Sequence, residues 1–76
     1  MIGYHVTTPK KLARYHMSGV ILPPVRFWPS LWSAQRWARK TGRSCIIKIY
    51  VQQVYPLPDH RPAYWTPEIV TLQTIE

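Results

Sequence analysis

The run Cys45–Val51, with the sequence CIIKIYV, is the clearest strand signal in the chain. Successive side chains of a strand point to opposite faces. One face carries Cys45, Ile47, Ile49 and Val51, and the other carries Ile46, Lys48 and Tyr50. Both faces are largely apolar, which is typical of a strand in the interior of a sheet. We therefore expect this run to be the central strand of the fold.

Two helices are predicted, over about residues 8–18 and 30–41. Thr8 followed by Pro9 is a helix start, because threonine accepts an amide hydrogen bond and proline suits the first helical position. Pro29 and Ser30 open the second helix in a similar way. Gly19 and Gly42 follow the two helices, where a left-handed residue commonly ends a helix.

Shorter strand signals surround these helices. They lie at residues 2–6, at the segment VRFW (25–28), and at residues 68–75, whereas the proline-rich segment 55–67 reads as a loop or extended segment. With 76 residues, the chain is long enough for one domain. We predict a single small α+β domain, residues 1–76, with one mixed or antiparallel sheet of about four short strands and two helices.

The net charge is +7, because ten lysines and arginines face only three acids, Asp59, Glu68 and Glu76. This excess predicts an anionic protein or nucleoprotein surface, or nucleic acid, as partner; the alternative is a merely solubilising surface. The single cysteine, Cys45, allows no internal disulfide, and no His/Cys spacing suits zinc. No run is long enough for a membrane span and no secretory signal is evident, so a cytoplasmic protein is expected.

The segment 26–43 combines three tryptophans with five cations. Helical spacing places Leu31, Ala34, Ala38 and Thr41 on one side, with Trp37 at its edge, and Trp32 on the opposite side. Trp37 is therefore expected in the core and Trp32 at least partly exposed. The predicted partner-binding residues are Trp32, Arg36, Arg39, Lys40 and Arg43. The alternative is a solvated helix face whose arginine stems merely cover Trp32.

Four segments together resemble the ADP-ribosyltransferase fold in its smallest form. They are YHVT (4–7), SGVILP (18–23), the segment 26–43 and CIIKIYV (45–51). The family is similar in having a Tyr/Leu-His-x-Thr strand, a helix leading to Gly-Leu-x-Pro, an aromatic strand, a helix with alanine and an aromatic-Ala pair, and another strand. The pattern covers roughly residues 3–51.

The resemblance implies an NAD site. It implies that His5 holds the ribose, that Thr7 supports it, and that Phe27 or Trp28 lies where the family often stacks an aromatic on nicotinamide. Glu68 is the only acid placed to imitate the catalytic glutamate. Family domains are usually considerably longer, and phenylalanine or tryptophan stands here where a tyrosine is found in the family.

Three functions follow as hypotheses. We favour a small basic binding or inhibitor module for an anionic partner such as nucleic-acid-handling machinery, without catalysis or cofactor. In size and charge such a module is similar to phage or mobile-element inhibitors, anti-CRISPR proteins among them. The alternatives are a minimal NAD-dependent ADP-ribosyltransferase using His5 and Glu68, and a non-specific nucleic-acid binder. For His5 the simpler interpretation is a strand histidine satisfied by a neighbouring carbonyl, and for His60, in PDHRP, a polar turn.

Overall fold

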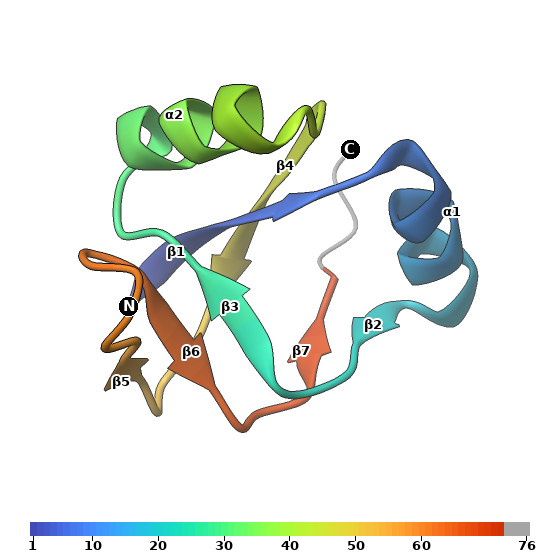
Figure 1. Ribbon diagram of the computed structural model, residues 1–76. Coiled ribbons are helices and arrows are strands. Elements are labelled where there is room, and N and C mark those ends of the chain that lie inside the picture. Colours follow the sequence, from blue (N-terminus) through green and yellow to red (C-terminus); the bar gives the residue numbers. More distant parts are fainter. Residues whose placement is uncertain (73–76) are drawn as a thin grey trace.

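The computed structural model describes residues 1–72, and their architecture is α+β, as the sequence predicts (Figure 1). The elements in chain order are β1 (Ile2–Thr7), α1 (Pro9–Ser18), β2 (Val20–Ile21), β3 (Val25–Phe27), α2 (Leu31–Thr41), β4 (Cys45–Tyr50), β5 (Tyr55–Pro56), β6 (Tyr64–Thr66) and β7 (Val70–Thr71). Helix α2 packs over β1 and β4, and α1 lies on the other side of the molecule next to β2 (Figure 1).

The strands form three small antiparallel ladders where a single sheet of about four strands was expected. They are β1–β4, β2–β7 and β3–β6–β5. The first and third ladders meet at one bridge, where Tyr4 and Trp28 exchange backbone hydrogen bonds of 2.8 and 2.9 Å. Proline residues precede β3 and follow it, and a proline has no amide to donate, so this strand pairing stays short.

The central position predicted for 45–51 is wrong for the part of the chain that the structure describes. Within residues 1–72, β4 pairs only with β1, in register from Ile2 opposite Tyr50 to Thr7 opposite Cys45. Strand β1 is the inner strand, because it also bridges to Trp28. On one face of β4, Ile47, Ile49 and the following Val51 pack into the core, whereas on the other face Ile46 packs and Lys48 and Tyr50 are exposed. Apolar residues on both faces therefore do not require a partner strand on both edges.

Both helices have the predicted ends. Thr8 Oγ1 accepts the amide of Lys11 at 3.3 Å, and Ser30 Oγ accepts the amide of Ser33 at 3.2 Å. Gly19 and Gly42 end the helices in the left-handed region, with φ of 79° and 71°. The capping residues therefore set the helix bounds locally.

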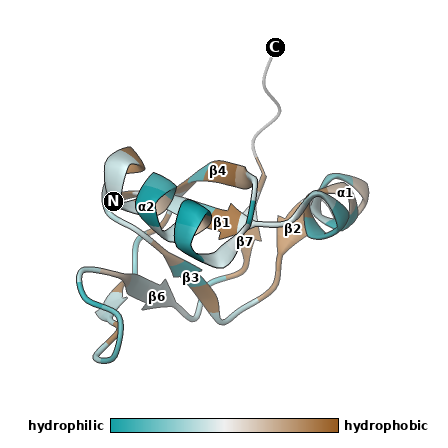
Figure 2. Cartoon of the chain, turned by 45° about the horizontal axis from the view of Figure 1, so that its top comes forward, coloured by the Kyte–Doolittle hydropathy of each residue, from teal (hydrophilic) through white to brown (hydrophobic). Residues whose placement is uncertain are grey.

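The core consists of two hydrophobic clusters. The larger contains Ile21, Val25, Phe27, Ile49, Val51 and Val70. The smaller contains Val6, Ala34 and Ala38, with Tyr4, Trp28, Trp37 and Ile46 packed against it. Hydrophobic colouring accordingly appears on β1, β2, β3 and β4, whereas α2 carries much hydrophilic colouring (Figure 2).

The backbone of Gly3 lies directly against the ring of Phe27, a residue of the larger cluster. A β-carbon placed on Gly3 would lie 2.2 Å from Cδ2 of Phe27, which is a clash. The missing side chain therefore lets β1 lie directly against the Phe27 ring, which is 1% exposed.

Two further sequence expectations meet the structure in part. Ala34 and Ala38 are buried, as predicted, whereas Trp37, expected in the core, packs against the smaller cluster but is only partly buried. Leu31 is 46% exposed and Thr41 is exposed too, because the buried side of α2 is narrower than its apolar spacing. The predicted final strand, 68–75, is observed as β7 alone, and positions 73–75 lie outside the described residues.

Among residues 1–72, no helix has the length and apolar character needed to cross a membrane.

Helix α2 offers a matched pair of tryptophans for testing this packing. Trp37→Ala is expected to destabilise the protein by about 3 kcal/mol, because it removes a large ring from the smaller cluster. Trp32→Ala, the same change on the exposed side, should alter stability by no more than about 0.5 kcal/mol. Urea unfolding followed by circular dichroism measures both; equal losses would contradict the packing.

Candidate functional site

A groove with three tryptophans opens between α2 and the loop at residues 59–62. Its volume is about 400 Å³. The lining residues are Trp28, Trp32, Ser33, Arg36, Trp37, Lys40, Asp59, His60, Arg61 and Pro62. We call it the tryptophan groove. Three of its lining residues are arginine or lysine and one is an acid, so its charge is predominantly positive.

The rings and cations of the groove form two sets of contacts, one around Trp37 and one between Trp32 and Arg36. The Trp37 ring lies 5.5 Å from Trp28 and 5.2 Å from His60, which meets it edge-on. The Arg36 guanidinium lies 4.9 Å from the centre of the Trp32 ring, and Lys40 Nζ lies 5.9 Å from that of Trp37. Cations held over indole faces are favourable, by roughly 0.5–1 kcal/mol where exposed.

The two walls of the groove are set by local hydrogen bonds. At the start of α2, the hydroxyls of Ser30 and Ser33 lie 2.8 Å apart and Ser33 also donates to the Ser30 carbonyl. In the opposite wall, the His60 amide donates to Leu57 at 3.2 Å and the Ala63 amide donates to His60 at 2.7 Å. The polar turn predicted for PDHRP is therefore observed, and it also contributes side chains to the groove.

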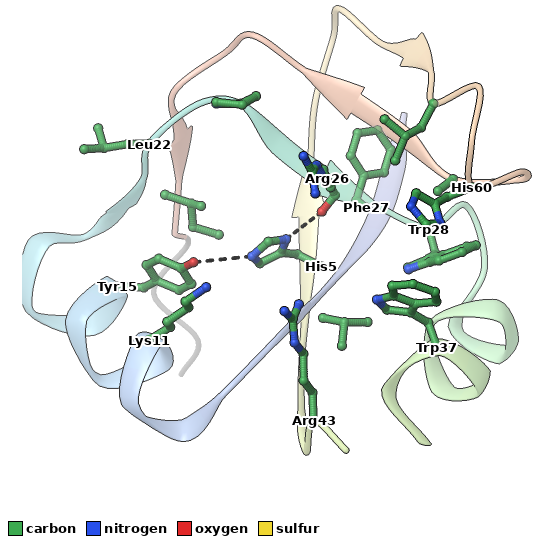
Figure 3. Close-up of a pocket in the computed structure, with 15 residues that line it drawn as sticks. His5, Lys11, Tyr15, Leu22, Arg26, Phe27, Trp28, Trp37, Arg43 and His60 are labelled. Atoms are coloured by element: carbon green, nitrogen blue, oxygen red, sulfur yellow. Dashed lines mark hydrogen bonds between the residues drawn. The ribbon is translucent and has the colours of Figure 1, made fainter. Parts of the chain in front are cut away.

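A second hollow lies on the other side of Trp28 and Trp37 (Figure 3). We call it the histidine cavity; its volume is about 310 Å³. Its lining includes three cations, Lys11, Arg26 and Arg43, and no acid among the described residues. Trp28, Trp37 and His60 line both hollows, so these three rings form a shared wall.

His5 is fixed within the histidine cavity by its ring nitrogens. Nδ1 lies 2.6 Å from the carbonyl oxygen of Arg26, which makes Nδ1 the protonated donor. Nε2 then faces the Tyr15 hydroxyl at the longer distance of 3.5 Å (Figure 3). The prediction of a strand histidine satisfied by a neighbouring carbonyl is confirmed, and the same residue lines a cavity.

The surroundings of His5 favour its neutral form. Burial lowers the pKa of the imidazole below its ordinary value of 6.5, and the nearby charges of Lys11 and Arg43 lower the pKa further. The hydrogen bond to the Arg26 carbonyl acts in the opposite direction. His5 is therefore a neutral group that presents an acceptor nitrogen among three cations.

Four of the five predicted partner-binding residues line one of the two hollows. Trp32, Arg36 and Lys40 line the tryptophan groove, as one surface. Arg39 is exposed on α2 but is not part of the groove lining, and Arg43 lines the histidine cavity instead. Trp32 is 63% exposed, as expected.

The residues of the implied NAD site are only partly brought together. His5, Phe27 and Trp28 line the histidine cavity. Thr7 is buried with an unpartnered hydroxyl oxygen and does not line the cavity. Glu68 lies elsewhere: its carboxylate accepts the backbone amides of Gln52, at 2.9 Å, and Gln53. The glutamate thus clamps the turn after β4 and does not face His5.

Sequence reasoning missed the contributions of Lys11, Tyr15, Arg26 and Arg61. Each comes from a separate segment and reaches its hollow only through tertiary packing. The proline-rich character of the loop that carries Arg61 was a usable signal, because prolines reduce the entropy cost of holding a loop fixed.

Comparison with family models, with curated proteins and with solved structures finds no match to this chain. Among the described residues, no group of three or more histidine, cysteine or acidic side chains could hold a metal ion.

The lowered pKa of His5 has a consequence for stability. The unfolded chain binds a proton at His5 more readily than the folded chain, so stability should fall as the pH drops below about 6.5. His5→Gln should reduce this fall, whereas the same change at the exposed His16 should leave it in place. Urea midpoints at pH 7.5 and 5 measure the effect, and an identical fall in His5→Gln would contradict it.

Proposed function

We propose that this protein is a small basic binding module for an anionic partner, and that it acts without catalysing a reaction. The observation that carries the proposal is the tryptophan groove, where Arg36, Lys40 and Arg61 surround exposed indole surface. In size and charge the protein is similar to small phage inhibitors of nucleic-acid-handling machinery. We therefore favour such machinery as the partner.

The distribution of charge supports this proposal. Six of the ten cations line the two adjoining hollows, namely Lys11, Arg26, Arg36, Lys40, Arg43 and Arg61. Glu68 uses its carboxylate on backbone amides, and Asp59 is the one acid of the groove within residues 1–72. The cations therefore create a local positive field that attracts an anionic partner and increases its association rate.

Heparin, a polyanion, provides a direct test. The double reversal Arg36→Glu with Lys40→Glu should elute from heparin at markedly lower salt than wild type, since it inverts the groove charge. The control is Lys10→Glu with Arg14→Glu, on exposed residues of α1 that line neither hollow. Both variants lower the net charge by the same amount. Equal elution of the two variants would sink the proposal, because net charge alone would then explain the binding.

The histidine cavity supports a second candidate function, namely NAD binding. The resemblance to ADP-ribosyltransferases implies an NAD site at His5, Thr7, Phe27 and Trp28, and all of these except the buried Thr7 line this cavity. The neutral imidazole keeps Nε2 as a hydrogen-bond acceptor, and a ribose hydroxyl at this nitrogen would take the place of the Tyr15 hydroxyl, which lies 3.5 Å away.

Transfer of ADP-ribose is nevertheless not expected. Glu68 holds the amides of Gln52 and Gln53, and no acid among the described residues lines the histidine cavity. Incubation with labelled NAD and a cell lysate should therefore leave all proteins unlabelled. Label that appears with wild type and disappears with His5→Ala or Glu68→Ala would show that the protein is the enzyme.

A further inference from the structure

We propose that the tryptophan groove binds single-stranded nucleic acid, with an unpaired base stacked on Trp32 and the adjoining phosphates held by Arg36, Lys40 and Arg61. This inference rests on the proposed function and specifies its partner. It is carried by three properties of the groove, which are its exposed ring, the spacing of its cations and its size.

The exposed ring is that of Trp32. At 63% exposure, it is a large apolar surface in contact with solvent. Arg36 covers one side of the ring at 4.9 Å, and the exposed remainder leaves a face for a second flat group. A nucleobase is such a group, because every base has a π-face that stacks on an aromatic side chain whatever its sequence.

The cations are spaced for a nucleic-acid backbone. Arg36 and Lys40 are one helical turn apart, about 6 Å along the axis of α2, which is of the order of one nucleotide step. Arg61 lies in the opposite wall, so phosphates entering the groove have positive charge on both sides. Arg36 lies over the Trp32 ring and Lys40 over the Trp37 ring. Phosphates bound by these two side chains would therefore lie next to the rings.

The size of the groove favours unpaired nucleotides over a duplex. A volume of about 400 Å³ is in the range of small-ligand sites and suits one or two unpaired nucleotides. In a duplex the base faces are stacked on one another and are inaccessible to Trp32. Single strands are therefore preferred over double strands.

An acidic peptide fits the groove less well. Peptides gain much of their affinity by adding a strand to a free sheet edge. Strand β6, after the loop at 59–62, is paired on both sides by β3 and β5. Strand β5, before the loop, is only two residues long and includes a proline, so it offers a short edge. Carboxylates would use the cations and leave the indole surface without a stacking partner. The observed combination of rings and cations favours nucleic acid.

Little sequence preference is expected. The Ser33 hydroxyl is already hydrogen-bonded within the Ser30 cap, which leaves few fixed groups to recognise base edges. Asp59, the acid of the groove, repels phosphate and can accept a hydrogen bond from a base amino group. Stacking, which tolerates any base, thus dominates recognition.

The test uses a fluorescein-labelled oligothymidylate and fluorescence anisotropy at fixed salt. Trp32→Ala should weaken binding about tenfold or more, the loss typical of one base stacked on an aromatic ring. Trp32→Phe should retain most of the affinity. Tyr50→Ala is the control, because Tyr50 is an exposed aromatic residue outside the groove, and it should bind as wild type does. Near-ultraviolet circular dichroism verifies that each variant is folded.

Three competitors separate this inference from the proposed function. A duplex of the same length, polyphosphate and polyglutamate should each compete more weakly than unlabelled oligothymidylate. Wild-type affinity in Trp32→Ala, or equal competition by any of the three, would overturn the inference. In that case, if Arg36→Glu with Lys40→Glu still elutes from heparin at lower salt than its control, the proposed function stands and the groove recognises charge alone. If heparin binding is also independent of the groove, both proposals fail.

Discussion

Everything in this fold depends on how β1 is joined to its two neighbours. On one edge it pairs with β4 over six residues, and on the other it meets Trp28 through one reciprocal pair of backbone hydrogen bonds from Tyr4. Gly3, one residue earlier, allows the Phe27 ring to approach the strand without a clash. Next to this bridge, His5, which follows Tyr4, lies beside the Arg26 carbonyl, and the Trp28 ring lies against Trp37. The bridge between Tyr4 and Trp28 therefore positions residues that line both hollows.

The helices could be predicted from the sequence because their ends are local events. Thr8, Ser30 and the two glycines act within a few residues, whatever the rest of the chain does. The same local reasoning failed for β4, where apolarity on both faces was taken as evidence for strands on both edges. Instead, Ile47 and Ile49 on one face pack in the larger cluster, whereas Tyr50 on the other face is exposed, and only tertiary packing determines this difference.

The candidate site shows the same division. The exposure of Trp32 and its contact with Arg36 follow from helical spacing, so the core of the predicted patch is found in the groove. The separation of Arg39 and Arg43 from that patch does not follow, because it depends on the loop at 59–62 and on the position of β1. Glu68 is the clearest case: its place in the sequence invited a catalytic interpretation, whereas its carboxylate is bonded to two backbone amides.

The shared wall of Trp28, Trp37 and His60 has a thermodynamic consequence. A guest in either hollow would lie against rings that also line the other hollow, so binding on one side would change the affinity on the other to the extent that it moves or rigidifies these rings. Linkage makes this dependence reciprocal: whatever factor one guest imposes on the affinity of the other is returned in equal measure. Any such coupling would run through Trp28, Trp37 and His60, because these residues line both hollows.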